Sequence, residues 1–183
     1  MSAIGIDLSL TSTGFCAIDD GTISVRRVRS QGARSATLRD RAERLQGLAE
    51  GLRDACLAWD ASLVAIEGPA INSKTGHMHD RSGLWWLVVL AMSDANIAVV
   101  EIAPTQVKKY ATGKGNASKD AVLAAVVRRY PQIEINGNDE ADALILAAMA
   151  SRFLGKPIED SLPQLHLETM EKVAWPVERP LVV

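Results

Sequence analysis

The stretch that decides the fold of this chain is residues 3–9, Ala3-Ile4-Gly5-Ile6-Asp7-Leu8-Ser9. Ile4 and Ile6 suit a pleated core and turn residues follow soon after, so the run predicts a short buried strand. An ionised Asp7 at the end of such a strand is costly to desolvate unless a metal ion, a backbone donor or a basic side chain compensates it. The plain alternative is that Asp7 caps a turn through Ser9 and Thr11, because aspartate is common in turns.

Length and composition predict one globular domain with a proper core. Hydrophobic residues make up 48% of the 183 residues and charged residues 23%, and both shares are ordinary for a folded domain. No basic region precedes the first strand, which argues against a signal peptide, and the most apolar run, 84–92, is too short to span a bilayer. Cys16 and Cys56 make no disulfide framework, so we expect a cytoplasmic protein without a membrane partner.

The distribution of charge says more than its sum. The net charge is −2, which does not by itself indicate nucleic-acid binding. Residues 26–44 nevertheless carry seven arginines against two acids, and residues 104–129 carry six basic residues against one acid. Two basic segments on an acidic chain could mark a face that binds a polyanion, and solvated helix faces explain the charges equally well.

Apolar periodicity predicts three strands, then helix, strand, helix, strand and two more helices. Strands are expected at 3–7, 15–18, 22–28, 63–67 and 97–102, and helices at 37–59, 81–96, 118–130 and from 139 to a stop at Gly155. Short turns make the first three strands an antiparallel meander, whereas the later strands must run parallel through helical crossovers. The predicted fold is α/β, a five-stranded mixed sheet with helices on both faces. Residues 1–155 form this domain, and residues 156–183, with four prolines and no clear period, are expected to be an extended or disordered extension.

Four carboxylates stand at positions where a site can form. Asp7 and Glu67 each end an apolar strand, at the sheet edge where open α/β folds place their sites. Asp139 and Asp142 share one face at the start of the last helix. Acids at a helix N-terminus interact favourably with the helix dipole, which would explain Asp139 and Asp142 but not Asp7 or Glu67. Four converging carboxylates would repel one another by on the order of 4 kcal/mol per pair, so they would need hard divalent cations, and two such ions form a site that displaces a phosphodiester oxygen.

Other catalytic patterns are weaker. The chain has three histidines and none stands in a nucleophile context, so no Ser/His/Asp set competes. His77 and His79, in a polar loop expected over residues 70–80, could ligate a metal but have no third ligand nearby. Gly113-Lys114-Gly115 lacks the spacing of a P-loop.

Five motifs occur in an order that points to one family. They are Ile4-Gly5-Ile6-Asp7 with Thr13-Gly14, Val64-Ala65-Ile66-Glu67, Pro104-Thr105-Gln106-Val107-Lys108-Lys109, Ser118-Lys119, and Asp139-Glu140-Ala141-Asp142-Ala143-Leu144. Over about residues 3–155 this order resembles the RuvC family of Holliday-junction resolvases, which have an RNase H-like fold. The family often carries an aromatic residue after the strand glutamate that stacks on a base at the junction centre, whereas Gly68-Pro69-Ala70 supplies none here. That departure, the acidic charge and the tail would suit a relaxed, phage-type branch nuclease.

The resemblance implies a mechanism and partners. It implies that Asp7, Glu67, Asp139 and Asp142 bind two Mg²⁺ or Mn²⁺ ions. It also implies that Lys108 and Lys119 act near the scissile phosphate. It further implies a homodimer that cuts two opposed strands of a four-way DNA junction and leaves ligatable nicks.

Two alternative functions remain open at this stage. Gly5-Ile6-Asp7-Leu8-Ser9 followed by Thr13-Gly14 also resembles the phosphate loop of actin-like and sugar-kinase ATPases, but those proteins duplicate the fold and this chain has room for one copy. A catalytically silent nucleic-acid-binding or dimerisation module of the same fold is the other alternative, and the four intact acids argue against it.

The helix expected over 81–96 is apolar all round. Its apolar residues are Leu84, Trp85, Trp86, Leu87, Val88, Val89, Leu90 and Met92. A helix that packs on a sheet needs one apolar stripe, so a second stripe predicts burial on the outer side as well. A two-fold partner helix would provide it and would relate two active sites by the symmetry of a junction, and the alternative cover is the protein's own tail.

Overall fold

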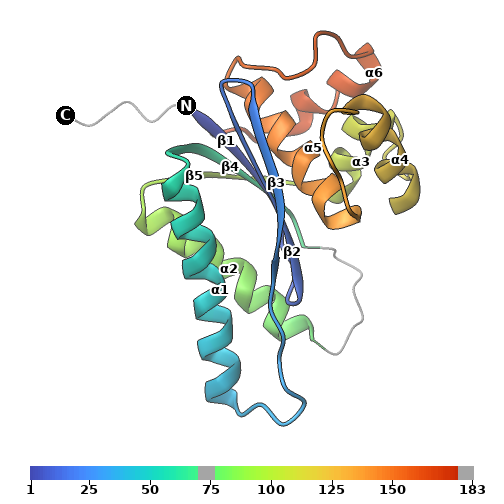
Figure 1. The fold of residues 1–183 in the computed structure, drawn as a ribbon. Helices are drawn as coiled ribbons and strands as arrows, with labels where there is room; N and C mark the ends of the chain where they lie inside the picture. The colour runs from blue at the N-terminus through green and yellow to red at the C-terminus, as the bar shows by residue number, and fades with distance from the viewer. Residues whose placement is uncertain (70–76, 177–183) are drawn as a thin grey trace, which may run out of the picture.

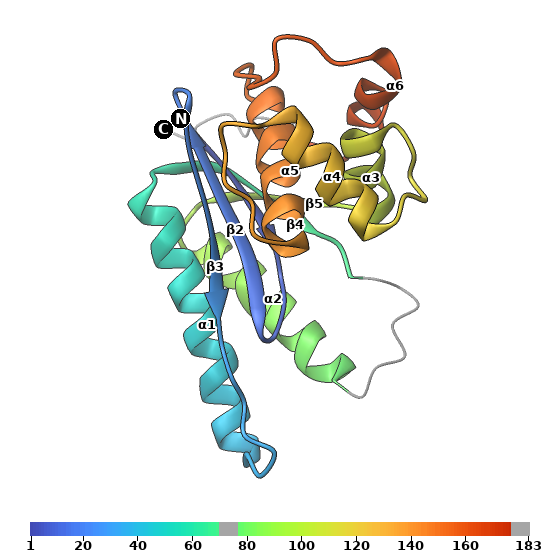
Figure 2. The same cartoon turned by 45° about the vertical axis from the view of Figure 1, so that its right-hand side comes forward.

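Two layers of helices enclose a five-stranded sheet (Figures 1 and 2). The structure is a computed structural model that describes residues 1–69 and 77–176. The strands are β1 (Ser2–Asp7), β2 (Ser12–Asp19), β3 (Thr22–Arg29), β4 (Ala61–Glu67) and β5 (Ala98–Ile102). They lie in the order β3-β2-β1-β4-β5, in which β1, β2 and β3 are antiparallel neighbours and β1, β4 and β5 run parallel. The predicted mixed sheet is confirmed.

The helices cover both faces of this sheet. They are α1 (Leu38–Ala58), α2 (Met78–Asp94), α3 (Pro104–Thr112), α4 (Lys119–Arg129), α5 (Asn138–Phe153) and α6 (Gln164–Leu167), followed by a 3-10 turn at Met170–Lys172. Figures 1 and 2 show α1 and α2 on one face and α3, α4 and α5 on the other. Each layer of helices encloses its own apolar core against the sheet.

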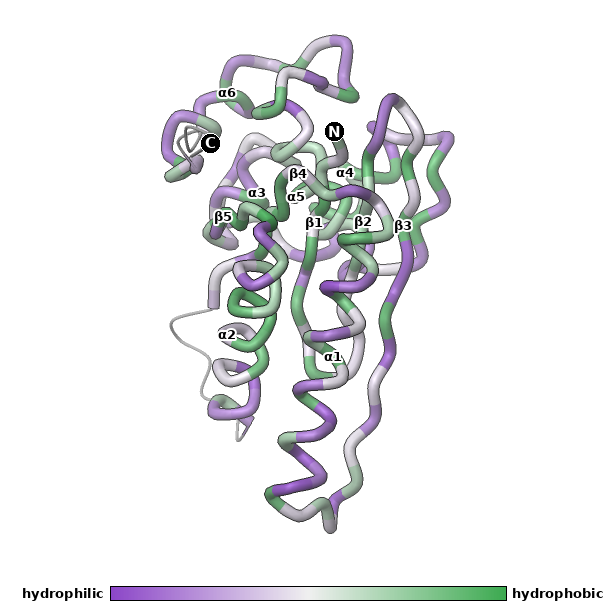
Figure 3. Tube along the Cα trace, turned by 90° about the vertical axis from the view of Figure 1, so that its left-hand side faces the viewer, coloured by the Kyte–Doolittle hydropathy of each residue, from purple (hydrophilic) through white to green (hydrophobic). Residues whose placement is uncertain are grey.

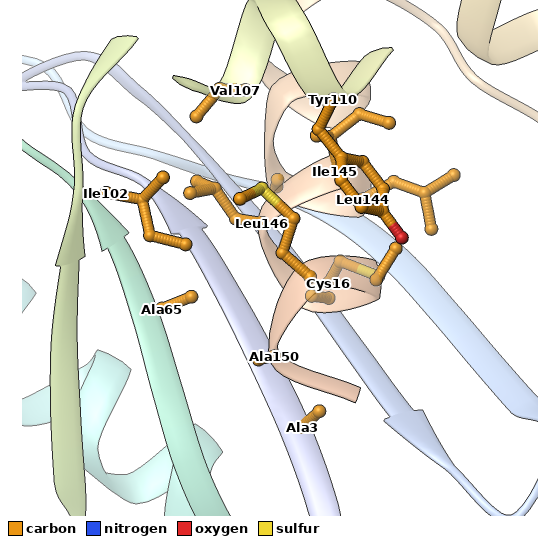
Figure 4. Close-up of a cluster of buried hydrophobic side chains, with 14 of the residues drawn as sticks. Ala3, Cys16, Ala65, Ile102, Val107, Tyr110, Leu144, Ile145, Leu146 and Ala150 are labelled. Atoms are coloured by element: carbon orange, nitrogen blue, oxygen red, sulfur yellow. The ribbon is translucent and has the colours of Figure 1, made fainter. Parts of the chain in front are cut away.

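Alternation along β1 divides its side chains between the two cores. Ile4 and Ile6 belong to the core under α1 and α2, and Ala3 belongs to the core under α5. Figure 4 shows Ala3 and Ala65 on this second face, with Leu146 of α5 above the strands. The small side chains on this face leave room for a closely packed helix.

Two glycines let α5 approach the sheet at backbone distance. A Cβ at Gly5 would lie 2.1 Å from the carbonyl oxygen of Ala143, and a Cβ at Gly14 would lie 1.9 Å from that of Asp139. With β1 and β2 below it and α3 and α4 around it, α5 is buried at every residue from 140 to 151. The sequence predicts one apolar face on this helix, whereas the fold buries it on all sides.

Some element boundaries differ from the sequence-based prediction. β2 begins at Ser12, inside the turn expected between residues 7 and 15, because its first residues already pair with β3, Ser12 with Arg29 and Thr13 with Val28. α2 begins at Met78 rather than at residue 81. α3 was not predicted, although Pro104 at its first position and the side chain of Gln106, which accepts a hydrogen bond of 2.8 Å from the amide of Ala103, are helix-start signals.

The C-terminal segment is folded where the structure describes it, so the prediction of an extended or disordered extension is wrong for residues 156–176. This segment contains α6 and the 3-10 turn, and it buries Glu159, Thr169 and Val173. Its helical pieces span four and three residues. Pieces of that length are too short to leave a period in the sequence, which is why pattern analysis missed them.

Two expectations concern the membrane and the histidines. Across residues 1–69 and 77–176, no helix has the length and apolarity needed to cross a bilayer. His77 is the N-cap of α2 and His79 lies in its first turn, while the rest of the predicted polar loop up to residue 76 lies outside the described residues. No cluster of three potential ligands forms around either histidine in the part of the chain that the structure describes.

Candidate active site

Two of the predicted acids meet at the carboxyl edge of neighbouring parallel strands. β1 and β4 pair in register up to Ile6 and Ile66, so the next residues on each strand, Asp7 and Glu67, emerge side by side. Asp7 is 9% exposed and Glu67 is half-buried. The register of the two strands therefore creates the first half of the site.

The other two acids reach this edge on the first turns of α5. The close contact between Gly14 and the backbone of Asp139 fixes the start of the helix against β2, beside the end of β1. The hydroxyl of Ser12 donates a hydrogen bond of 2.7 Å to Oδ2 of Asp139 and so orients that carboxylate. Asp142, one turn further, is 8% exposed. Sequence analysis missed Ser12, because only the tertiary contact between β2 and α5 shows that it lies beside these acids.

The electrostatics show that the four carboxylates form one cluster. Burial, followed by the charges of Glu67, Asp142 and Asp139, raises the pKa of Asp7 to about 8. Burial and then the charge of Asp142 raise the pKa of Glu67 to about 7. Burial also raises the pKa of Asp142 to about 6, with the charge of Asp139 contributing. Shifts of this size are typical of functional sites, where like charges are held together at a cost in stability.

Two lysines extend their positive charge toward the same cluster. Lys119, the first residue of α4, lowers the pKa of Asp7, Glu67 and Asp142, and Lys108 of α3 lowers that of Glu67 and Asp142. Lys119 is exposed and Lys108 is half-buried. Each of the six residues singled out in the sequence thus interacts electrostatically with at least one other member of the set.

The two basic segments of the sequence, residues 26–44 and 104–129, make different kinds of contact in the structure. In the first, Arg27 pairs with the buried Glu140 at 3.0 Å, Arg41 pairs with Asp80, and Arg44 donates to the backbone oxygen of Leu10. Much of its charge therefore supports the fold. The second segment, residues 104–129, carries the two lysines that face the acids, and so it is the basic segment of the candidate site.

The turn after β1 closes without Asp7. The hydroxyl of Thr13 donates to the backbone oxygen of Ser9 at 2.8 Å, and the amide of Ser9 donates back to that hydroxyl at 3.1 Å. The amide of Thr11 lies 3.4 Å from the hydroxyl of Ser9. Ser9 and Thr13 therefore make the turn-capping hydrogen bonds that the alternative interpretation assigned to Asp7.

The donor set fits hard divalent cations. It consists of carboxylate oxygens, which Mg²⁺ and Mn²⁺ prefer, and its raised pKa values report burial and mutual repulsion, both of which a bound cation would offset. In the described ranges no three acidic, histidine or cysteine side chains stand around a common point.

A five-stranded mixed sheet of this order with helices on both faces is an RNase H-like fold, and in this chain acids stand at the ends of β1 and β4 and on α5, which crosses them. The chain belongs to one family within it: the family model of crossover junction endodeoxyribonuclease RuvC matches residues 3–150. The RuvC of Rhizobium rhizogenes (strain K84 / ATCC BAA-868) is 33% identical over 144 residues, which cover 79% of this chain and 85% of that protein. The RuvC of Synechococcus sp. (strain WH7803) is 31% identical over 150 residues, covering 80% and 96%.

Solved structures agree in fold. Thermus thermophilus RuvC matches with a TM-score of 0.63 and 20% identity over 85% of this chain and 98% of that one. The same protein in complex with a Holliday junction substrate matches with a TM-score of 0.66, also at 20% identity, over 85% and 97%. Family membership leaves the ATPase alternative without support.

Proposed function

We propose that this chain is a metal-dependent, structure-selective endodeoxyribonuclease that cleaves four-way DNA junctions by hydrolysing phosphodiester bonds. The observation that carries the proposal is the burial and mutual repulsion of the acids on β1, β4 and α5, which together raise the pKa of Asp7 to about 8. Such a cluster destabilises the fold unless a cation binds it. The relatives are named crossover junction endodeoxyribonucleases, and one structural neighbour was solved with a Holliday junction, which supports the substrate.

Each group of residues has a role in the proposed reaction. Asp7, Glu67, Asp139 and Asp142 would hold two Mg²⁺ or Mn²⁺ ions, and Ser12 would keep Asp139 turned toward them. When bound, a pair of such ions supplies an activated water and neutralises the leaving 3′ oxygen. Lys108 and Lys119 place positive charge where negative charge grows on the phosphate in the transition state.

The proposed substrate range extends beyond four-way junctions. Gly68 and Pro69 follow the strand glutamate directly, so no aromatic ring from these two positions can stack on a base at a junction centre. A site without that ring would discriminate less sharply between branches. We therefore expect three-way and flap DNA to be cut as well, at lower rates than the four-way junction.

One experiment tests the proposal against its alternative. Labelled four-way, three-way, flap and linear DNA are incubated with the protein and Mg²⁺, with EDTA, and with the Asp7→Asn variant. We expect cutting of branched DNA that EDTA and Asp7→Asn both abolish, while Asp7→Asn still binds the junction, because a neutral amide is a poor ligand for a hard cation. Junction binding without any cutting would instead identify a catalytically silent module.

We also propose that the active form is a two-fold dimer built on α2, within residues 81–96. α2 packs Leu84, Val88 and Met92 against the sheet and leaves Trp86 59% and Leu90 55% exposed. These two lie one turn apart and form an exposed apolar stripe on α2. Figure 3 shows that much of α2 is made of hydrophobic residues. The described part of the C-terminal segment packs on α3, on the opposite face of the sheet, so it does not cover this stripe.

A further inference from the structure

A single buried carboxylate in the C-terminal segment joins three helices. The side chain of Glu159 is 4% exposed. Its oxygens accept hydrogen bonds from the phenol of Tyr110 on α3 at 3.1 and 3.2 Å and from that of Tyr130, the C-cap of α4. It also pairs with Arg152 in the last turn of α5 at 2.9 Å. Each of these helices carries part of the proposed active site.

The buried carboxylate of Glu159 has partners that compensate its charge. A charged carboxylate is costly to bury unless it is paired and hydrogen-bonded, and here two phenols and a guanidinium offset the cost. Burial first, and the charge of Glu159 next, raise the pKa of Tyr110 and Tyr130, so both phenols stay protonated donors. A polar network in which every member has its partner holds one geometry, and removal of the carboxylate would leave two buried phenols and the partly exposed guanidinium of Arg152 without this shared partner.

The C-terminal segment also binds α3 through residues before and after Lys108. The side-chain amide of Gln106 donates to the backbone oxygen of Lys172 at 2.8 Å, and Lys109 pairs with Glu168 at 2.8 Å. His166 of α6 lies with Nδ1 2.7 Å from the backbone oxygen of Tyr110. Residues before and after the lysine are thus held by the tail.

α3 depends on such support. It spans nine residues, a length at which an isolated helix is marginal, and it ends at Gly113, whose φ is +79°. Its buried side chains Val107 and Tyr110 fix how deep the helix sits, and Figure 4 shows Tyr110 against Ile145 and Leu144 of α5. The ties to the C-terminal segment add the polar contacts that resist rotation about the helix axis.

We propose that Glu159 is a positioning residue for the reaction: by tying α3 to α4 and α5, it fixes the direction in which Lys108 faces the acids. This inference rests on the proposed function, because it takes Lys108 to act on the phosphate. Glu159 lies beyond residues 3–150, so it is outside the segment that matches the family. The C-terminal segment of this chain is then part of the catalytic architecture rather than a dispensable tail.

The first test separates positioning from stability. We expect Glu159→Gln to lower kcat for a four-way junction roughly tenfold, with KM changed less than about twofold, because misplacing a group at a phosphate costs turnover. The neighbouring Asp160 is exposed, so Asp160→Asn removes the same charge without touching the network and should leave kcat unchanged.

A double-mutant cycle with Lys108→Ala then assigns the effect. If Glu159 acts through Lys108, Glu159→Gln lowers kcat much less in the Lys108→Ala background than in the unmodified protein. Equal losses in both backgrounds would overturn the proposal, as would an unchanged kcat in Glu159→Gln. Cleavage by the unmodified protein that Asp7→Asn abolishes would leave the proposed function intact in either case.

Hydrogen exchange provides a readout that does not depend on turnover and that applies even if Glu159→Gln is less stable. The amides of residues 107–112 should exchange at least tenfold faster in Glu159→Gln, while those of β1 keep their protection. Uniform loss of protection across α3 and the sheet would show a general loss of stability and would refute a positioning role. Glu168→Gln, which weakens only the partly exposed pair with Lys109, should give a smaller change confined to α3.

Discussion

The substitution Asp7→Asn should stabilise the metal-free protein, although it removes a residue of the proposed active site. The pKa of Asp7 is about 8 in the fold against 3.8 in the unfolded chain. Between these two pH values the folded protein keeps a proton that the unfolded chain has released. The free energy of unfolding therefore falls as pH rises from 4 to 8, and asparagine, which has no such proton to lose, removes this dependence.

The magnitude follows from the size of the shift. At pH 8 the shift of about four pKa units lowers the free energy of unfolding by on the order of 5 kcal/mol. At pH 6 the loss is on the order of 3 kcal/mol, because pH 6 lies only about two units above the pKa of the unfolded carboxyl. Relaxation and entry of water recover part of that cost in a real site. We therefore expect Asp7→Asn to be more stable by at least about 2 kcal/mol at pH 8, with a smaller gain at pH 6.

Urea denaturation in EDTA at pH 6 and pH 8 measures both quantities. Asp160→Asn, on the surface, controls for the loss of one negative charge. Mg²⁺ should then stabilise the unmodified protein at pH 8 much more than Asp7→Asn, because ligand binding to the folded state adds to its stability. Equal stabilities of the unmodified protein and Asp7→Asn at pH 8, or a gain that does not grow with pH, would refute the electrostatic account of the cluster.

Three further predictions follow from the packing and the charges. Lys119→Ala should lower kcat more than tenfold with little change in junction affinity; a loss of binding with normal turnover at saturation would show that the lysine only positions DNA. Gly14→Ala should destabilise the fold by about 2 kcal/mol or more in urea denaturation, because its Cβ would lie 1.9 Å from the backbone of Asp139. The control is Gly47→Ala on α1, where a Cβ meets no other atom, and this substitution should be neutral or stabilising. Trp86→Glu should be monomeric in light scattering and should nick junctions without coordinated double cutting. If the unmodified protein is monomeric at micromolar concentration and still cleaves both strands efficiently, the proposed dimer is wrong.

Trp86 is a better probe of the dimer than its neighbour. The indole of Trp85 donates a hydrogen bond of 3.2 Å to the backbone oxygen of Glu67, so a charge at Trp85 would disturb the end of β4 as well as the outer surface. Sequence periodicity treats both tryptophans alike. The fold ties Trp85 to the end of β4 and leaves Trp86 exposed, where the proposed partner would cover it.

The sequence by itself determined the sheet and the two pairs of acids. Alternation around Ile4 and Ile6 and the short turns after them specify strands, and the helical crossovers force the later strands to be parallel, because these rules act locally or through chirality alone. Strand ends at Asp7 and Glu67 then lie at one edge by topology. The spacing of Asp139 and Asp142 follows from the helix period.

Only the tertiary structure decided how these parts meet. The helix α5 reaches Asp7 because Gly5 and Gly14 have no Cβ, and a glycine in a strand does not announce which backbone will approach it. The hydrogen bond from Ser12 to Asp139 joins residues 127 positions apart, and the carboxylate of Glu159 joins three helices from a segment without any period. Contacts of this kind depend on the register and depth of packed elements, which no local pattern encodes, and so the sequence shows which acids are candidates for the site while the fold shows what holds them in place.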